Sequence, residues 1–352
     1  MFMFRLLIFL SLISFSFTVM SCEKENEGNS YSFDSCSEIP SCWENEYNES
    51  CYKLDFLGKK ECVFVGFITD LHYSSIGSGY NENLLRKGIY EASCVLNSLS
   101  KKYQFSQIVF GGDYIQLSID EYKGQTQEQG ISCVKDALSL SMWMNAPTFL
   151  LRGNHEYNYS GTGNGFGMTS AQYYAFVTSH LSKDYVIDTP NNWAYYDDQQ
   201  SKIRYVFLDV IDSKKNESQY TWLKSKALAT IPSDFSVMFF SHFPLVKYSS
   251  NGDCNTYYSD LILKCKQKGV DVIACVAGHL HADKHLMENG ILHMTTLQAG
   301  FWTSCRSEDG QVYVHQENTS NQSAFDVLAI DKKNRKIYIV RLGLGNDRVF
   351  EY

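Results

Sequence analysis

Five short apolar runs in this chain each end on His, Asp or Asn side chains, and this repeated arrangement constrains the fold most strongly. Apolar runs of this length predict strands that are buried on both faces of a parallel sheet. Ligands of open α/β sheets bind at the carboxyl ends of the strands, so we expect these polar side chains to gather at one site. The runs are residues 62–69, 107–110, 147–151, 236–240 and 270–277.

Longer amphipathic segments lie between or beside these runs, and strand alternating with helix predicts an α/β domain with parallel pairing. After Gly290 the pattern becomes rich in strands, and residues 291–297, 324–330 and 336–342 are predicted as antiparallel strands, the last two joined by a polar turn at 331–335. The predicted helices are residues 83–100, 128–144, 171–181, 218–229 and 259–268.

The composition is that of a folded domain. The 352 residues are 44% hydrophobic and 20% charged, which is enough to bury a core and excludes wholesale disorder. The length indicates one large domain with appendages. Because the net charge is −8, broad nucleic-acid binding is not expected, and phosphate chemistry would need a local cation.

Residues 1–21 are predicted to be a secretory signal. The apolar stretch 6–20 is too short for a comfortable membrane span and is followed by acidic residues, although a helix that stays attached is the alternative. Residues 19–22 (Val-Met-Ser-Cys) resemble a bacterial lipobox, so Cys22 is a candidate lipidation site. We therefore expect an extracytoplasmic protein, either held at the membrane through Cys22 or released after simple cleavage.

Residues 22–60 are predicted to form an acidic tether and a Cys-rich extension, and residues 61–352 the main domain. Disulfides are the expected state of clustered cysteines in an exported protein. A zinc knuckle is the rival, but no CxxC pair or nearby His supports it. Cys275, inside an apolar run, is a buried thiol or a bridge. The clustered cysteines are Cys36, Cys42, Cys51 and Cys62.

The polar side chains after the strands are suited to metal binding. Carboxylates, imidazoles and an amide oxygen bind Mn, Fe or Zn without a thiolate, and a shared Asp can bridge two ions about 3.5–4 Å apart. Gly112, Gly153 and Gly278 would leave room for ions and substrate oxygens. The candidates are Asp70, His72, Asp113, Asn154, His155, His242, His279 and His281.

These motifs resemble, in order, those of the calcineurin-like metallophosphoesterase superfamily. The matching strings begin at Asp70 (DLH), Gly111 (GGD), Gly153 (GNHE), Ser241 (SH) and Gly278 (GHLH), and the resemblance spans roughly residues 61–300. It implies a four-layer α-β-β-α sandwich of two mixed sheets, with the metal site at the carboxyl ends of the strands. The segment 341–348 also resembles the end of some bacterial and phage members.

The resemblance assigns a role to each residue. The first ion would be held by Asp70, His72, Asp113 and His281, and the second by Asp113, Asn154, His242 and His279. His155 would not be a ligand but would help the leaving group depart. The implied reaction is hydrolysis of a phosphomonoester or phosphodiester by a hydroxide that bridges the two ions.

One position departs from relatives that resemble protein phosphatases. Their GDxxD segment carries a second Asp that supports the catalytic histidine, and Gln116 stands there in this chain. We expect Gln116 to orient the His155 ring through its carbonyl, and we do not expect a phosphoprotein substrate. Asn154 and Arg152 are candidate substrate contacts, with a structural ion pair as the alternative for Arg152.

Three segments near the motifs are candidate walls of the substrate site, with ordinary surface loops as the alternative: residues 157–169, 246–257 and 301–322. A phosphoesterase is the first functional hypothesis. The alternative is a metal-holding surface protein for binding or adhesion with degenerate catalysis, although the full ligand set and His155 favour an enzyme. A metallopeptidase or amidase is a third possibility, but the chain contains no HExxH motif to support it. The sequence predicts neither the substrate nor the oligomeric state.

Overall fold

Two β-sheets packed face to face form the centre of the fold. The computed structural model describes residues 38–73, 82–116, 127–139, 144–156, 168–181, 184–248, 254–300 and 304–352. The first sheet has the strand order β15-β14-β13-β1-β2-β3, with β1, β2 and β3 parallel and the other pairs antiparallel. Its strands are β1 (Val63–Ile68), β2 (Gln107–Phe110), β3 (Thr148–Leu150), β13 (Ala324–Asp331), β14 (Lys336–Gly343) and β15 (Arg348–Glu351).

The second sheet has the order β4-β5-β6-β7-β8-β10-β9. Its central strands β6, β7, β8 and β10 are parallel, and antiparallel strands flank them. The strands are β4 (Val186–Ile187), β5 (Ala194–Asp198), β6 (Ile203–Leu208), β7 (Ser236–Ser241), β8 (Asp271–Ala277), β9 (Lys284–Glu288) and β10 (Ile291–Thr295). Strands β11 (Cys305–Arg306) and β12 (Val312–Tyr313) form a separate small pair.

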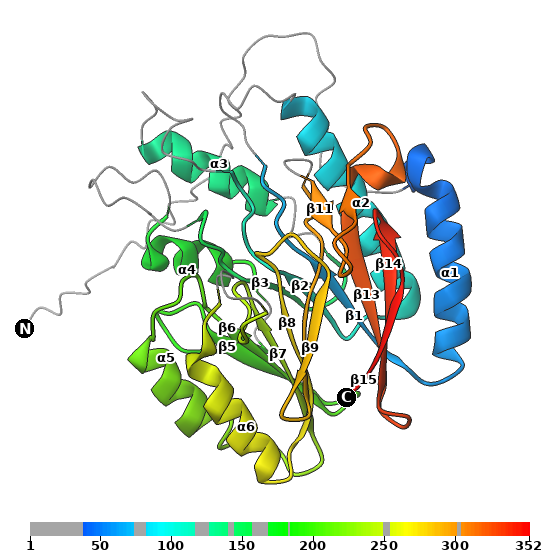
Figure 1. The fold of residues 1–352 in the computed structure, drawn as a ribbon. Helices are drawn as coiled ribbons and strands as arrows, with labels where there is room; N and C mark the ends of the chain where they lie inside the picture. The colour runs from blue at the N-terminus through cyan, green and yellow to red at the C-terminus, as the bar shows by residue number, and fades with distance from the viewer. Residues whose placement is uncertain are drawn as a thin grey trace, which may run out of the picture. The chain divides into compact units, whose positions relative to one another are not determined.

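Helices cover the outer faces of both sheets (Figure 1). Helices α1 (Glu44–Gly58) and α2 (Glu82–Tyr103) pack on the first sheet, and α5 (Glu217–Trp222) and α6 (Ser259–Gln267) pack on the second. The predicted four-layer sandwich is therefore confirmed. The other helices are η1 (Ser41–Trp43), α3 (Gln127–Ser139), α4 (Ser170–Thr178), the π-helical η2 (Leu223–Ala227), η3 (Thr256–Tyr258) and η4 (Ser320–Gln322).

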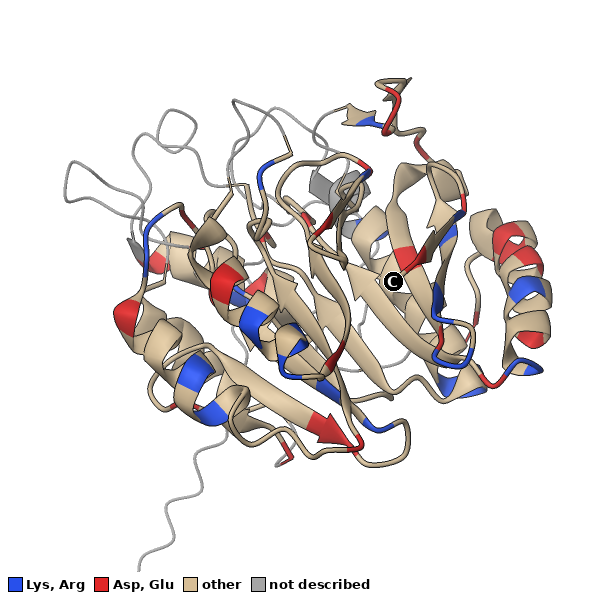
Figure 2. Ribbon diagram, turned by 60° about the horizontal axis from the view of Figure 1, so that its bottom comes forward, with Lys and Arg blue, Asp and Glu red and all other residues tan. Residues whose placement is uncertain are grey.

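The core lies between the sheets. Alternate residues of a strand face opposite sides, so Val65 and Phe67 of β1 enter the central core, whereas a Cβ on Gly66 would meet Leu96 of α2. Figure 2 shows Lys, Arg, Asp and Glu mainly on helices and loops, while most strand residues are uncharged. This distribution explains why the strands were visible in the sequence as apolar runs.

All five strands predicted from apolar runs are present, and residues 324–330 and 336–342 form the antiparallel pair β13–β14. Two details differ. Strand β10, expected to be antiparallel, pairs in parallel with β8 and antiparallel only with β9. Strand β6 was not predicted, because Arg204 interrupts its apolar pattern; that side chain is buried against Asp197 and lies over the ring of Tyr195.

The predicted boundary at residue 60 does not separate the Cys-rich extension from the domain. Helix α1 belongs to the same compact unit as the sheets and contacts β14 and α2, with Trp43 and Leu54 fully buried. The disulfides expected among the clustered cysteines are wrong for Cys42, Cys51 and Cys62, which are free thiols.

Burial raises the pKa of the Cys42 and Cys62 thiols to about 11 and so keeps them protonated at neutral pH. Cys94 of α2, in contrast, is disulfide-bonded. The predicted signal, Cys22 and Cys36 lie outside the described residues. Among the residues that are described, no helix has both the length and the apolar character of a membrane span.

Candidate metal centre

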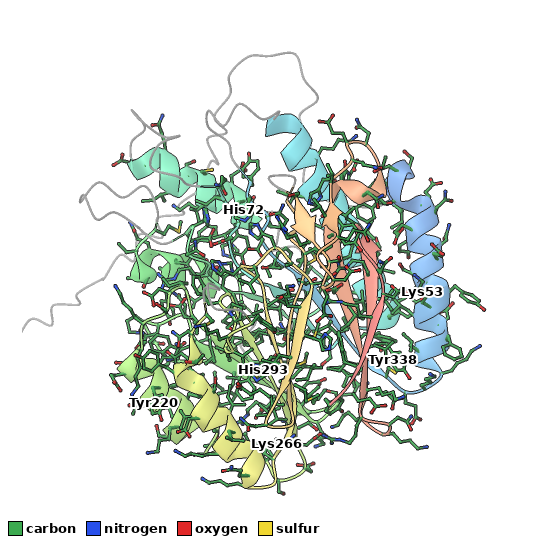
Figure 3. The ribbon with its side chains drawn as sticks, viewed as in Figure 1. Lys53, His72, Tyr220, Lys266, His293 and Tyr338 are labelled. Carbon is green, nitrogen blue, oxygen red and sulfur yellow. The ribbon has the colours of Figure 1, made fainter. Side chains whose placement is uncertain are left out.

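The first group of ligand atoms joins the end of β1 to the end of β8. The Nε2 atoms of His72 and His281 lie 2.9 Å apart, and the Oδ1 atom of Asp70 lies 3.2 Å from Nε2 of His281 and 3.8 Å from Nε2 of His72. Asp70 and His72 are almost fully buried. In Figure 3, His72 lies near the upper ends of the strands. Two imidazoles and a carboxylate that converge in this way can hold one divalent ion.

The second group joins the ends of β2, β3, β7 and β8. Nε2 of His242 lies 3.1 Å from Oδ2 of Asp113 and 3.0 Å from Oδ1 of Asn154, and Asp113, His242 and His279 form a second set of possible ligands. Nδ1 of His242 lies 2.8 Å from the carbonyl oxygen of Gly111, which fixes the ring so that Nε2 faces the carboxylate. These are the four residues assigned to the second ion.

Asp113 lies between the two groups. It is grouped with His242 and His279 on one side and with His72 and His155 on the other, as a bridging ligand requires. The backbone N–H of His155 donates to Oδ1 of Asp113 at 2.9 Å, and Nε2 of His155 lies 3.8 Å from Oδ2. His155 is thus held beside the bridge, with 21% of its side chain exposed.

The backbone at the ligands is strained. Five of the seven predicted ligands have positive φ without being glycine: Asp70, His72, Asp113, His279 and His281, with φ between 44° and 69°. Each such residue costs about 1–3 kcal/mol and persists only where its surroundings enforce it. Gly153 is required by a close approach, since a Cβ there would lie 2.1 Å from Oδ1 of Asp113. Backbone strain at this density marks a functional site.

Glu156 is a site residue that the sequence analysis missed. Its fully buried carboxylate accepts the backbone N–H groups of Asp113 and Gly153 on Oε2 and those of Tyr114 and Ile115 on Oε1, at 2.7–3.3 Å. It therefore ties the loop after β3 to the loop after β2. Its position at the end of the GNHE motif, directly after His155, is the sequence feature that could have identified it.

The electrostatics of the site favour a bound cation. Burial opposes the ionisation of Asp70 and Asp113, but the surrounding histidines outweigh it and lower the pKa of both carboxyls. Burial and His281 lower the pKa of His72 to about 3, so this imidazole is neutral, as a metal ligand must be.

His242 behaves in the opposite way. Burial disfavours its charged form, yet Asp113 and Asp70 raise its pKa to about 9. The two carboxylates thus attract a positive charge into this buried site, and a divalent ion can supply that charge in place of the proton. The donor set and its charge fit two divalent ions.

Two predicted roles do not match the structure. Arg152 is buried and forms a bidentate ion pair with Asp209, at 3.1 and 2.7 Å, while its Nη1 donates to Ser170, which supports the structural alternative over a phosphate contact. Nδ1 of His155 is buried without a hydrogen-bond partner among the described residues, so Gln116 does not orient this ring. Instead, the backbone of Gln116 donates to Tyr73.

The predicted substrate walls are described only in part. Residues 157–167, 249–253 and 301–303 lie outside the described residues. Of the remainder, β11, β12 and η4 belong to the 301–322 segment, and the backbone N–H of Arg306 in β11 donates to the carbonyl oxygen of His281 at 3.2 Å. This contact places part of the segment next to the first ligand group.

The fold and the paired ligand groups define a two-sheet α/β metalloprotein with its site at the carboxyl ends of the strands. The family model for calcineurin-like phosphoesterases matches residues 65–283, more than half of the chain. The protein belongs to the calcineurin-like phosphoesterase family and is a hydrolase of the metallophosphoesterase class, whose members use dinuclear metal centres.

One solved structure agrees in fold, and a second is less similar. A dimetal phosphatase from Danio rerio is 13% identical, with a TM-score of 0.53, over 82% of this chain and 99% of that chain. A purple acid phosphatase from yellow lupin is 14% identical, with a TM-score of 0.48, over 82% of this chain and 53% of that chain. A search of curated proteins found no match at the significance required.

Proposed function

We propose that this protein hydrolyses phosphomonoesters or phosphodiesters outside the cytoplasm, using two divalent ions of Mn, Fe or Zn. One observation carries the proposal: Asp113 belongs to ligand groups on both of its sides, with His155 fixed next to it. Bound ions of this kind supply positive charge to the phosphoryl oxygens and activate water for attack.

Two residues of the chain would bind the substrate and supply a proton. Asn154, with its Oδ1 3.0 Å from Nε2 of His242, would hold the second ion through that oxygen and orient a phosphate oxygen through its amide N–H. His155 would hold a proton at Nε2 and deliver it to the departing alkoxide oxygen. A positioned general acid of this kind typically contributes about 10² to 10⁴-fold to the rate.

The test is a panel of phosphomonoesters and phosphodiesters assayed on protein of measured metal content. Chelated protein should be inactive, and Asp113→Asn should lose both ions because the variant weakens a ligand shared by the two groups. Asp271→Asn, which removes an exposed ion pair with Arg335, is the matched control and should keep both. Metal-free protein with full activity would overturn the proposal, and stoichiometric metal without hydrolysis of any ester would favour a binding role instead.

The location outside the cytoplasm is a proposal of its own. It is supported by the signal-like residues 1–21, by the lipobox-like residues 19–22 and by the disulfide at Cys94, since disulfides persist mainly in oxidising compartments. We expect the mature chain to begin at a lipidated Cys22 and to partition with membranes, and Cys22→Ser to be released or left uncleaved. An intact mass that shows an unmodified start at another residue would exclude the lipid anchor but not the enzyme.

A further inference from the structure

A buried cluster of two arginines and two aspartates lies beside the first ligand group. Arg341 of β14 donates from Nε to Asp326 at 2.6 Å and from Nη2 to Asp283 at 2.8 Å. Arg348 of β15 lies 3.0 Å from Asp283 and 3.3 Å from Asp326. The side chains of Arg341, Asp283 and Asp326 are 1%, 6% and 0% exposed. A buried cluster of this kind has a defined geometry, because an unpaired member would be a buried charge.

Asp283 connects this cluster to a predicted metal ligand. It lies two residues after His281, and its backbone N–H donates to the carbonyl of Arg306, whose own N–H donates to the carbonyl of His281. Ala282 lies between His281 and Asp283, and its carbonyl accepts a hydrogen bond from the hydroxyl of Thr295 at 2.7 Å. The backbone of 281–283 is therefore held on β10 and β11, and the carboxylate of Asp283 holds the same segment on β14 and β15.

The ligand loop needs such support. His279 and His281 both have positive φ, 69° and 49°, although neither is glycine. A loop that relaxed to ordinary φ values would turn the imidazole of His281 away from Asp70, and Nε2 of His281 now lies 3.2 Å from Oδ1 of that residue. The first ion would then lose one of its two imidazoles. Of the second group only His279 lies in this loop; it is four residues from Asp283 and its ring is stacked on Phe243, while His242 and Asn154 follow other strands.

We propose that Asp283, held by Arg341 and Arg348, is a positioning residue for the first metal group, and that the C-terminal strands β14 and β15 thereby set the affinity of that group for its ion. The proposal rests on the proposed function in requiring two bound ions. It goes beyond what the family match supplies, because that match ends at residue 283 and both arginines lie after it.

The experiment is a titration of metal-free protein with Co²⁺ alone, followed by visible absorption and by equilibrium dialysis, so that the two sites are resolved without any hydrolysis assay. Asp283→Asn should weaken one site about 10- to 100-fold, the usual effect of losing a residue that supports a ligand, and leave the other within about twofold. Arg341→Lys keeps the positive charge but loses the planar guanidinium that contacts Asp326 and Asp283 together, so it should weaken the same site. The matched control is Asp197→Asn, which breaks another bidentate pair, with the buried Arg204, away from the ligand loops.

Near-UV circular dichroism and thermal melting establish that each variant is folded. If Asp283→Asn does not fold, the metal affinities of Arg341→Lys provide the test. Equal weakening of both sites, or no weakening in a folded variant, would overturn the inference, as would the same site-selective loss in Asp197→Asn. Wild-type protein that binds two Co²⁺ ions but hydrolyses no ester would overturn the proposed function while leaving this inference standing.

Discussion

The ring of Phe243 lies face to face on the imidazole of His279, with the ring centroids 3.7 Å apart and the planes inclined by 18°. Phe243 directly follows His242, and its backbone N–H donates to Val210 at 3.0 Å, so one strand end supplies both a ligand and the surface that orients another ligand. Stacked aromatic pairs contribute about 0.5–1.5 kcal/mol beyond the area that they bury. The stack therefore restricts the rotation of the His279 ring.

Phe243→Leu should keep an apolar side chain but lose the stack, and we expect the second ion to bind up to about tenfold more weakly while the first is unaffected. Metal titration of folded protein measures this difference. Phe350→Leu is the control, because Phe350 lies against His285, which is not a predicted ligand. Unchanged affinity in Phe243→Leu would show that the backbone alone orients His279.

His155→Ala should leave both ions bound but slow the hydrolysis of alkyl phosphates by about 10² to 10⁴-fold, because an alkoxide departs poorly without a proton. Nitrophenyl esters, whose leaving group needs little protonation, should lose much less. Steady-state rates on matched alkyl and nitrophenyl esters give the comparison, with His285→Ala as a control outside the site. Equal losses on both kinds of ester would assign His155 to phosphate binding instead.

Glu156→Gln should destabilise the fold. The carboxylate accepts four backbone N–H groups, two on each oxygen, and an amide would present its own donors to two of them. Each unsatisfied buried donor costs about 1–3 kcal/mol, so we expect a loss of several kcal/mol in urea unfolding. Glu351→Gln, at an exposed pair with Lys336, should cost at most about 1 kcal/mol. Similar midpoints for the two variants would contradict the role of Glu156.

Gly300→Ala should disturb the loop that carries Asp70 and His72. The N–H of Gly300 donates to the carbonyl of Asp70 at 3.0 Å, and a Cβ on Gly300 would lie 2.0 Å from the carbonyl oxygen of Leu71. We expect a loss of about 1–3 kcal/mol, typical of overpacking, together with weaker binding of the first ion. At Gly58 a Cβ would meet nothing nearer than 4.0 Å, so Gly58→Ala is the matched control. Metal affinity equal to that of the control would show that the loop adapts freely.

His293 of β10 should make stability depend on pH. Burial lowers its pKa to about 4 from the ordinary 6.5, and its Nδ1 has no hydrogen-bond partner among the described residues. Between these pH values the unfolded chain binds a proton that the folded chain does not, so stability falls as the pH falls from about 6.5 to about 4. The contribution is at most about 3 kcal/mol.

His293→Leu should remove this part of the slope. Because the site histidines also titrate, the quantity to measure is the difference between the unfolding free energies of variant and wild type, taken from pH 4 to pH 7. His180→Leu, at an exposed position, serves as the control. A difference that does not vary with pH would contradict the prediction.

The sequence predicted the strands and the identity of the clustered side chains because both follow from local rules. Buried parallel strands are apolar throughout, and their carboxyl ends converge, so Asp70, Asp113 and His281 meet although they lie far apart in the chain. The antiparallel pair β13–β14 was visible for a similar reason, since a short polar turn separates two apolar runs.

What escaped prediction depends on partners that a sequence does not display. Arg152 was a candidate phosphate contact, and only the position of Asp209 at the end of β6 shows that its charge is neutralised. Helix α1 falls in a segment predicted as an extension because its sequence is mostly acidic and polar, yet Leu54 and Leu57 of this helix are buried. Clustering along the chain suggested disulfides for Cys42, Cys51 and Cys62, but all three are free thiols in the folded domain.

The register of β1 against β13 joins segments that lie far apart in the chain. Val63 pairs with Ile330, so the strand that presents Asp70 and His72 lacks one neighbour until a segment more than 250 residues later in the chain is in place. Contacts between such distant segments form slowly and leave apolar strand faces exposed in the meantime. We therefore expect the support that β13 gives to the strand carrying Asp70 and His72 to form late in folding.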